Sequence, residues 1–390
     1  MIICYSNSLQ TNPEEIIFPL MKKTTALCVR EVETLFNPFS SRKIKLSSRV
    51  VMAPMIRNLA PDGVPTPEMA MYYRLRAERD VGLIITEPSA IDDPAAADDA
   101  CMPLFYGGAA LRGWKRICRA VHATNCKIVP LLCHVGMLRP GVGDLPQSGD
   151  LPIGPSGINP ITLEKTGEGM SRQRIAEVCA SFARAAFLAQ QLGFDGVEIQ
   201  GGQGCLIDQF LWQETNHRRD IYGGDIVGRA RFACEVIHAV RKAVGRAFPI
   251  LFRFSQWKKG HPQAQLVKTP LEMSELLQPL CAAGVDIFDC SENVHGGAAF
   301  AGSAFSLAAW VKLLSGKPVI SGGAAWETPF RQEREAVHVQ RLIRLLRSGE
   351  VDLVSVGRGL LADAAWAEKT RHGRESEIIP FTLRSLSRLY

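Results

Sequence analysis

Short apolar runs recur along the chain, and most are followed by a stretch with helical periodicity. Eight of these runs are nearly continuous in apolar residues, which is typical of strands buried on both faces of a sheet. We predict strands at residues 50–53, 83–86, 128–132, 197–199, 250–254, 287–290, 318–321 and 353–356.

Two of the intervening stretches show the helical period clearly. In residues 172–191 and 229–245, apolar side chains recur every three or four positions and form one stripe. Gly193 and Gly284 lie where helices are expected to end before the next strand. The stripes comprise Ile175, Val178, Phe182, Ala186 and Ala189 in the first stretch, and Phe232, Val236, Ile237 and Val240 in the second.

Eight strand–helix units predict an α/β fold, namely a closed (β/α)8 TIM barrel. The sequence has no GxGxxG between a strand and a helix and no GxxxxGK[ST] phosphate loop. A doubly wound open sheet is the alternative. A long loop rich in Gly and Pro, residues 137–170, follows the third strand. Loops of this length usually form a lid or a substrate wall, and a poorly ordered insertion is the other interpretation.

The repeating pattern starts near Leu35. We therefore expect an N-terminal extension, residues 1–33, that is flexible or loosely docked. Residues 34–390 are expected to form one barrel domain, because a chain of 390 residues with 46% hydrophobic content can bury one large core.

Charge and cysteine content narrow the class of protein. The net charge of +6 is spread along the chain, and its densest basic patches, Lys258–Lys259 and residues 341–347, lack interleaved aromatic residues. This pattern argues against a nucleic-acid partner. Eleven unpatterned cysteines favour a reducing, cytoplasmic location. No apolar run approaches the ~20 residues that cross a bilayer, so no membrane association is expected.

Glycines at two neighbouring strand ends predict an anion site. Gly322 and Gly323 follow the seventh strand, and Gly357 with Arg358 follows the eighth. Glycine allows close approach of the backbone, and arginine can bind a phosphate through two hydrogen bonds. In TIM barrels the loops after strands seven and eight commonly form a phosphate site. The alternative is a pair of ordinary glycine turns with a surface arginine.

Several other polar residues interrupt apolar strands. Arg253 is costly to bury without an anionic partner, so it either faces a bound group or forms an ion pair inside the barrel. His134 could serve as an acid, a base or a ligand, but a structural, hydrogen-bonded histidine is the more common case. Glu87 and Glu198 are expected to be structural anchors rather than an acid–base pair. The eight histidines show no zinc-type spacing, so no metal site is expected.

Residues 196–224 are the most informative segment: a buried strand that ends in a polar, glycine-rich loop. Together with motifs elsewhere, this segment resembles the Old Yellow Enzyme family of FMN-dependent NADH:flavin oxidoreductases and ene-reductases, and in part a bacterial branch of that family. The motifs occur in order over residues 35–370: Ala53-Pro54-Met55, residues 83–87, His134-Val135-Gly136, residues 206–211, Asp220 with Tyr222-Gly223-Gly224, Arg253, and Gly357-Arg358.

The resemblance implies a barrel that holds FMN over its C-terminal mouth and uses NADPH or NADH as reductant. Hydride would then pass to the activated C=C of a small unsaturated substrate. By the same resemblance, Arg253 would face the N1/O2 edge of the flavin. The implied phosphate-binding residues are Gly322, Gly323, Gly357 and Arg358, and Ala53, Pro54 and Met55 would also contact the cofactor.

The chain departs from the family at the residues that carry the chemistry. Where relatives use His, His or Asn, and Tyr, this chain has Gln200, Gln203 and Cys205. A glutamine can donate an N–H to a developing oxyanion, but it cannot become a cation. Cys205 could donate a proton, because its reference pKa of about 8.5 is below that of tyrosine. Burial in an apolar site would instead make this cysteine an inert filler.

Three further substitutions lie at positions that contact the flavin ring in relatives. Ile56 replaces the residue that tunes the ring potential, Leu131 replaces a glutamine, and Pro88 replaces a residue whose N–H reaches the ring. Proline has no N–H to donate. We therefore expect FMN binding with an altered potential and a specialised substrate.

These observations favour an FMN-dependent oxidoreductase, either monomeric or homodimeric, that acts on a small molecule. Two alternatives stay open. The first is a flavin-assisted desaturase or isomerase, because loss of a fixed proton donor weakens net reduction. The second is a catalytically impaired flavin-binding pathway partner.

Overall fold

The computed structural model describes residues 29–140, 152–292, 297–323 and 335–389. Eight parallel strands close into a barrel in the order β3-β4-β5-β8-β9-β10-β11-β12, and β12 pairs with β3. All eight predicted runs are barrel strands, so the TIM barrel is confirmed and the open sheet is wrong. The strands are β3 Val50–Met52, β4 Leu83–Ala90, β5 Lys127–Cys133, β8 Val197–Gln200, β9 Ile250–Ser255, β10 Ile287–Glu292, β11 Val319–Gly323 and β12 Leu353–Val356.

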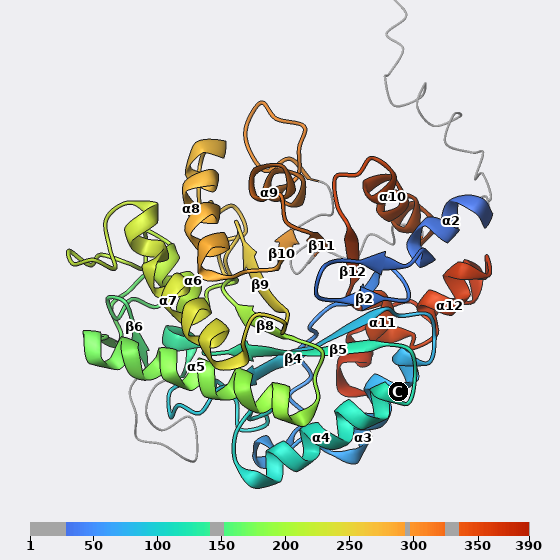
Figure 1. Ribbon diagram of the computed structural model, residues 1–390, viewed down its shortest axis with the longest axis horizontal. Helices are drawn as coiled ribbons and strands as arrows, with labels where there is room; N and C mark the ends of the chain where they lie inside the picture. Colours follow the sequence, from blue (N-terminus) through green and yellow to red (C-terminus); the bar gives the residue numbers. More distant parts are fainter. Residues whose placement is uncertain (1–28, 141–151, 293–296, 324–334, 390) are drawn as a thin grey trace, which may run out of the picture.

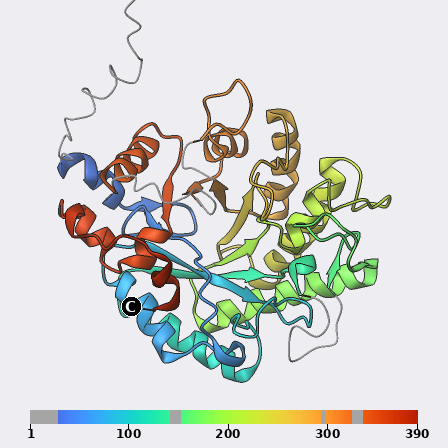
Figure 2. The ribbon, with the colours of Figure 1, turned by 180° about the vertical axis from the view of Figure 1, so that it is seen from behind.

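Helices surround the strands (Figure 1). Seen from behind, the C-terminal helices lie beside the N-terminal segment, where α12 packs against α2 (Figure 2). The helices are α2 Val29–Phe36, α3 Pro67–Ala77, α4 Gly108–His122, α5 Arg172–Leu192, α6 Leu206–Leu211, α7 Ile226–Val244, α8 Pro270–Ala283, α9 Leu307–Ser315, α10 Glu335–Arg347, α11 Arg358–Ala362 and α12 Trp366–Arg371. The remaining elements are β1 Phe39–Ser40, β2 Lys45–Leu46, β6 Ile153–Gly154, β7 Glu168–Gly169, and the 3-10 turns η2 Pro61–Gly63, η3 Gly136–Leu138, η4 Glu375–Glu377 and η5 Leu383–Ser387.

Capping residues fix the ends of the long helices. The Ser171 hydroxyl accepts from the N–H of Arg174 at the start of α5, and Gly193 ends that helix at a φ of 93°. Only glycine adopts that angle without strain, which explains the predicted stop. The apolar stripes of α5 and α7 are buried as predicted. Helix α7 begins three residues before the predicted start, because the Asp225 carboxylate caps Gly228.

Strand β4 continues through Pro88, past the predicted end at Thr86. The register with β5 shifts between Ile85 and Pro88, which marks a β-bulge. Proline cannot donate to the ladder, and a bulge is one of the few places in a sheet that tolerate it. At the bulge the Thr86 hydroxyl accepts from the N–H of Leu131 at 3.3 Å.

Inward-facing side chains divide the barrel interior into two levels. The lower level is an apolar cluster that we call the barrel floor, closed from below by the β1–β2 hairpin. The upper level, toward the C-terminal ends of the strands, carries the polar residues Glu198, Gln200, Arg253, Asp289 and Ser291. The barrel floor consists of Phe39, Ile44, Leu46, Val51, Leu83, Ile85, Val129, Leu131, Leu251, Ile287, Ile320 and Leu353.

The family-like motif at residues 216–224 forms a closed turn between α6 and α7. The Asn216 amide donates to the carbonyls of Phe210 and Tyr222, both at 2.7 Å. Arg218 donates to Asp220 at 2.9 and 2.8 Å. A side chain at Gly223 would lie 2.0 Å from the Arg218 carbonyl, so only glycine fits there. Hydrogen bonds within this turn therefore explain why these residue types occur at these positions.

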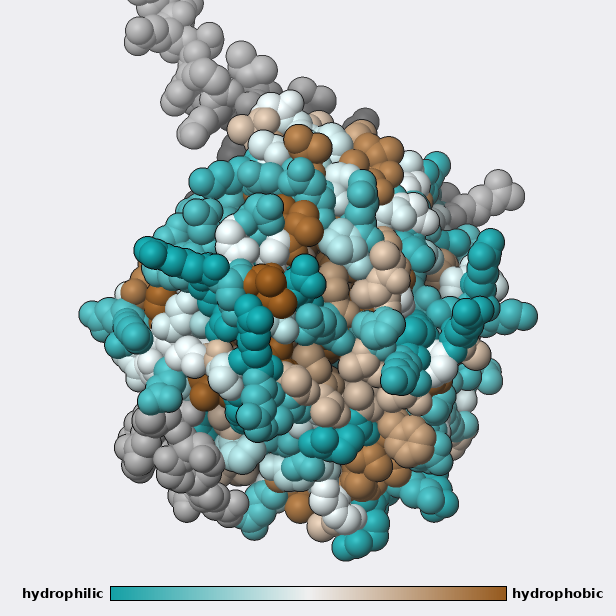
Figure 3. Space-filling model, turned by 60° about the vertical axis from the view of Figure 1, so that its left-hand side comes forward, coloured by the Kyte–Doolittle hydropathy of each residue, from teal (hydrophilic) through white to brown (hydrophobic). Residues whose placement is uncertain are grey.

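The predicted long loop follows β5 and includes η3, β6 and β7, while residues 141–151 lie outside the described part. Residues 1–28 also lie outside it, so the division at residues 33 and 34 stays a prediction. Among the described helices, none is long and apolar enough to cross a membrane. Figure 3 shows one face of the molecule, on which hydrophobic side chains form small patches among hydrophilic ones.

We predict that the barrel floor carries a large share of the stability. Replacement of Leu353 by alanine removes a fully buried side chain and should lower the free energy of unfolding by about 2–5 kcal/mol. Urea denaturation measures this change. The control is Leu271→Ala on α8, where the side chain is 70% exposed and the change should stay within about 0.5 kcal/mol. Equal unfolding midpoints for the two variants would contradict the assignment of the floor.

Candidate active site

The C-terminal mouth of the barrel gathers the residues singled out in the sequence. Gln200 ends β8 and lies in register with Arg253 on β9. On the other side, Gly357 follows β12, and a side chain there would lie 2.8 Å from the Met55 sulfur. The N–H of Ala53 donates to the carbonyl of Val356 at 3.0 Å. The segments that carry the predicted cofactor residues after β3 and β12 therefore lie side by side.

Gln200 and Gln203 are linked through their side-chain amides. The Gln200 Nε2 lies 3.5 Å from the Gln203 Oε1, and the Gln203 Nε2 donates to the Ser291 hydroxyl at 3.0 Å. The backbone N–H of Gln203 donates to the Ser255 hydroxyl at 3.1 Å. The Oε1 of Gln200 is buried without a partner among the described residues. Gln203 is thus oriented by β9 and β10, whereas Gln200 contacts the Gln203 amide and retains an unused acceptor.

The turn that carries Gln203 is held by a second set of contacts. Gln203 and Gly204 have φ angles of 61° and 86°, which places two consecutive residues in the left-handed region. This conformation costs a non-glycine residue about 1–2 kcal/mol. The N–H of Gly204 donates to the Asp208 carboxylate at 2.7 Å, and Lys258 donates to the other oxygen of that carboxylate at 2.7 Å. Asp208 thus stabilises the turn.

Lys258 has a structural role beside the candidate site. It belongs to one of the densest basic patches in the sequence, yet its side chain is fully buried against Asp208. Its ammonium group also donates to the carbonyl of Ser255 at 3.0 Å. Burial lowers the pKa of Lys258, and Asp208 opposes that shift. The Lys258–Asp208 ion pair connects the end of β9 to α6 beside the candidate site. The sequence did not reveal this role.

Arg253 forms an ion pair inside the barrel, one of its two predicted roles. Its guanidinium donates to Asp289 on β10. Burial acts to lower the pKa of Arg253, but Asp289 and Glu198 outweigh it and raise the pKa, so the arginine stays charged. Burial, and then Asp289, raises the pKa of Glu198 well above its ordinary value. Glu198 is therefore a buried carboxyl group beside the Arg253–Asp289 ion pair.

Glu87 anchors the loop after β3. One of its carboxyl oxygens accepts from the N–H groups of Arg57 and Asn58, at 2.8 and 2.9 Å. The Arg57 side chain in turn donates to the carbonyls of Ser385 and Leu386, at 3.2 and 3.1 Å. Burial raises the pKa of Glu87 to about 7. The expected anchoring role agrees with these contacts.

His134 is buried beside Asp93 and accepts one hydrogen bond. Its Nδ1 accepts from the N–H of Gly136 at 3.0 Å, and its Nε2 lies 3.3 Å from the Asp93 carboxylate. Burial lowers the pKa of His134, and Asp93 opposes that shift. This geometry supports the structural interpretation. Within the described ranges, no three His, Cys, Asp or Glu side chains are grouped as metal ligands.

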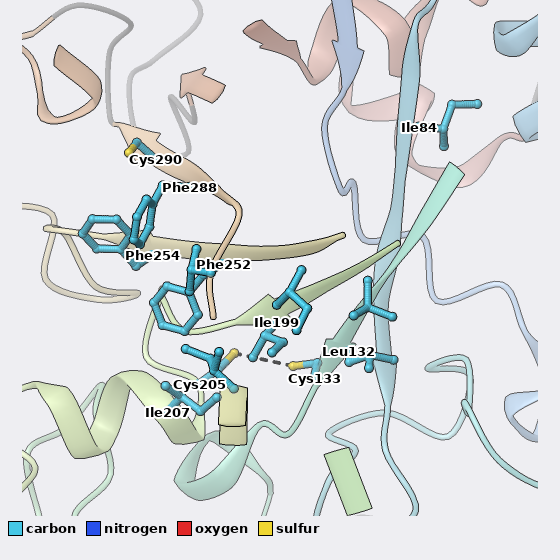
Figure 4. Packing of buried hydrophobic residues seen from close by; sticks show 14 of the residues in the cluster. Ile84, Leu132, Cys133, Ile199, Cys205, Ile207, Phe252, Phe254, Phe288 and Cys290 are labelled. Atoms are coloured by element: carbon cyan, nitrogen blue, oxygen red, sulfur yellow. Dashed lines mark hydrogen bonds between the residues drawn. The ribbon is translucent and has the colours of Figure 1, made fainter. Parts of the chain in front are cut away.

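Cys205 lies at the N-cap of α6, almost buried, in the apolar cluster outside the barrel floor. The sulfur of Cys133, at the end of β5, lies 3.8 Å from the Cys205 sulfur (Figure 4). The sequence analysis did not single out Cys133. Two thiols therefore meet where the resemblance implies a tyrosine.

The three substituted ring positions differ in their surroundings. Ile56 is 53% exposed on the loop after β3, and Pro88 is half-buried opposite Leu131 in the β4–β5 register. Leu131 is fully buried in the barrel floor. These three side chains add no hydrogen-bond donors to the mouth. A bound flavin ring would meet mainly apolar surface from β4 and β5 and polar groups from β8 and β9.

A cavity of about 240 Å³ opens beside this site, over the ends of β9 and β10. Its lining includes Gln256, Trp257, Gln265 and Ser291. Ser291 also accepts the hydrogen bond from Gln203, so the cavity borders the amide pair directly. Its walls offer amide and hydroxyl groups and the carboxyl group of Glu292, together with apolar surface.

Comparison with known proteins adds independent information. A family model described as the NADH:flavin oxidoreductase / NADH oxidase family matches residues 34–377. An NADH oxidase of Thermoanaerobacter brockii is 32% identical over 356 residues, which cover 88% of this chain and 52% of that protein. A chanoclavine-I aldehyde reductase of Penicillium roqueforti is 37% identical over 269 residues, covering 65% of this chain and 72% of that protein.

Among solved structures, morphinone reductase in complex with tetrahydroNAD matches with a TM-score of 0.76 and 25% identity. The match covers 90% of this chain and 93% of the other. The chain spans about half the length of the bacterial NADH oxidase.

We predict that Glu87 makes stability depend on pH. The pKa of the Glu87 carboxyl group is 4.5 in the unfolded chain and about 7 in the folded protein. Folding therefore favours its protonated form. The stabilisation of the folded protein by protonated Glu87 is therefore full below about pH 4.5 and is lost as the pH rises to about 7. The isosteric variant Glu87→Gln should therefore gain about 3 kcal/mol relative to the wild type between pH 5 and pH 8.

Urea denaturation of both proteins at the two pH values measures this difference. Other titrating groups are common to both proteins and cancel in the comparison. An identical pH dependence for wild type and variant would refute the shifted pKa.

Proposed function

Because this chain belongs to the NADH:flavin oxidoreductase / NADH oxidase family, the Old Yellow Enzyme family, we propose that it is an FMN-dependent oxidoreductase. It passes hydride from NADPH or NADH, through FMN, to the activated C=C of a small unsaturated substrate. The observation that carries the proposal is the arrangement at the barrel mouth. Arg253 and the amide pair come from β8 and β9, and the glycine turns with Arg358 come from β11 and β12.

The residues present fit FMN at its phosphate end. Gly322 and Gly323 at β11 and Gly357 with Arg358 at β12 lie on hydrogen-bonded neighbouring strands. The Arg358 guanidinium lies 5.8 Å from the centre of the Phe381 ring. These four residues would hold the phosphate, and Arg253 would face the N1/O2 edge of the ring. When bound, FMN supplies the hydride-transfer chemistry that the protein side chains lack.

Gln200 and Gln203 would bind a substrate carbonyl. Each amide carries N–H donors; that of Gln203 is fixed by Ser291 on β10, and that of Gln200 lies 3.5 Å from the Gln203 oxygen. Donors fixed in advance stabilise charge that develops on an oxygen, because no reorganisation is needed during the reaction. A neutral amide pair gives less stabilisation than a cationic histidine, which favours substrates that are already strongly polarised. Ala53, Pro54, Met55, Ile56, Pro88 and Leu131 complete the proposed cofactor surroundings.

Cys205 is the proposed proton donor to the substrate, with water as the substitute. The thiol contacts Cys133 and lies almost buried in an apolar cluster, where solvent has little access to resupply its proton. This observation favours the second candidate function, a flavin-assisted desaturase or isomerase that needs no net protonation. A cytoplasmic enzyme, monomeric or homodimeric, remains the expected context.

The first test is the absorption spectrum of the purified protein followed by anaerobic titration with NADPH or NADH. We expect a flavin spectrum that bleaches with the reductant. Arg358→Ala should raise the Kd for FMN about tenfold to a hundredfold, because a charge-assisted hydrogen bond is worth about 1.5–3 kcal/mol. Quenching of FMN fluorescence measures that Kd. A protein that takes up no FMN on reconstitution would overturn the proposal.

The second test concerns the amide pair. Gln203→Glu keeps the side-chain shape but removes the N–H donors, so reduction of 2-cyclohexenone should slow by about 100- to 1000-fold. The control Gln278→Glu makes the same atomic change on an exposed face of α8 and should leave the rate unaltered. Flavin content, read from the spectrum, shows that both variants are folded. A rate within threefold of the wild type would exclude Gln203 as an oxyanion donor.

A further inference from the structure

Cys133 and Cys205 bring two sulfur atoms into contact, although neither the fold nor the proposed hydride transfer requires them to meet. Cys133 ends β5, and Cys205 precedes α6, 72 positions further along the chain. Their sulfur atoms lie 3.8 Å apart and point toward one another (Figure 4). A disulfide requires a separation of about 2.05 Å, which small side-chain rotations can supply from this starting point.

We propose that Cys133 and Cys205 are a redox-active dithiol, and that a peroxide converts them to a disulfide that closes the candidate site. The two thiols come from different segments, so the disulfide would tie the end of β5 to the start of α6. Gln203 lies two residues before Cys205, and the covalent bond would therefore restrain the turn that carries the amide pair.

The difference in exposure sets the order of events. Cys205 is 8% exposed, whereas Cys133 is 1% exposed. Contact with Cys205, and then burial, raises the pKa of the Cys133 thiol well above its ordinary value. Cys133 thus remains a thiol that donates toward the Cys205 sulfur. Cys205 is the sulfur that a peroxide reaches first, and Cys133 is the resolving thiol.

The reaction balances in two steps. The Cys205 sulfur attacks hydrogen peroxide, an S–O bond forms, the O–O bond breaks, and one water leaves. The Cys133 sulfur then attacks the sulfenic acid, the S–S bond forms, the S–O bond breaks, and a second water leaves. Two electrons pass from the sulfurs to the peroxide, and both thiol protons end in water.

The consequence for activity rests on the proposed function. Oxidation removes the Cys205 S–H, the proposed proton donor, and restrains the turn of Gln203. The oxidised protein should therefore lose at least tenfold in enone reduction, and a reductant should restore it. Formation of the disulfide itself does not depend on flavin or turnover.

The test uses the full chain, reduced with a phosphine, desalted and treated with hydrogen peroxide. After N-ethylmaleimide blocks the remaining thiols, a non-reducing digest is analysed by mass spectrometry. We expect a linked peptide that contains Cys133 and Cys205, two hydrogen atoms lighter than the separate thiol peptides. Addition of a reductant should abolish the linked peptide.

Two variants give the matched comparison. Cys133→Ala should abolish the linked peptide and leave Cys205 as a sulfinic acid or a maleimide adduct. Cys179→Ala removes a thiol from α5 that is 7% exposed, similar to Cys205, and should leave the link intact. Each variant's activity after treatment is compared with its own untreated activity.

The proposal is overturned if the native protein forms no Cys133–Cys205 link at any peroxide dose, whether Cys205 stays a thiol or is oxidised further. A link that forms only after denaturation in urea also overturns it. Because the mass measurement needs no turnover, a protein without flavin still tests the dithiol. Failure of the proposed function would leave this result unaffected.

Discussion

The buried charge of Arg253 is the constraint on which the arrangement of the barrel mouth depends. A guanidinium inside a barrel is tolerated only with anionic partners, and Asp289 on the next strand supplies one. Burial acts to lower the pKa of Arg253, but Asp289 and Glu198, on the two neighbouring strands, outweigh it. The cluster fixes three adjacent strands in register. The cluster thereby also positions the next inward-facing residues along these strands, which are Gln200, Ser255 and Ser291.

A second buried ion pair extends this order into the loop. Asp208 and Lys258 are fully buried, and removal of one partner from such a pair typically costs about 3–5 kcal/mol. Their contacts hold the N–H of Gly204 and the end of β9, which lets Gln203 adopt a left-handed backbone angle. The backbone strain at Gln203 is thus offset by the contacts of Asp208 with Gly204 and Lys258. The position of the two amides follows from charge pairs that do no chemistry themselves.

Sequence patterns predicted the scaffold better than the site. Continuous apolar runs identified all eight strands, because burial on both faces leaves a local signal, and Gly193 marked a helix end through its backbone angle. The roles of Cys133 and Lys258 were missed because each depends on a partner 50 or more positions away. A lysine beside another lysine has the pattern of a surface charge. Only the fold shows that one of them faces Asp208.

The two levels of the barrel interior explain how the chemistry could change while the fold stayed constant. Leu83 and Leu353 belong to an apolar floor that contributes stability, and the level above it contributes polar groups. Substitutions at the mouth therefore need not disturb the floor, which is the usual division of labour in TIM barrels. In this chain, amides and thiols occupy the positions where the resemblance implies ionisable imidazole and phenol groups. On the proposed dithiol chemistry, the mouth carries a sulfur pair in place of a phenol, so peroxide would change its activity through these two sulfurs.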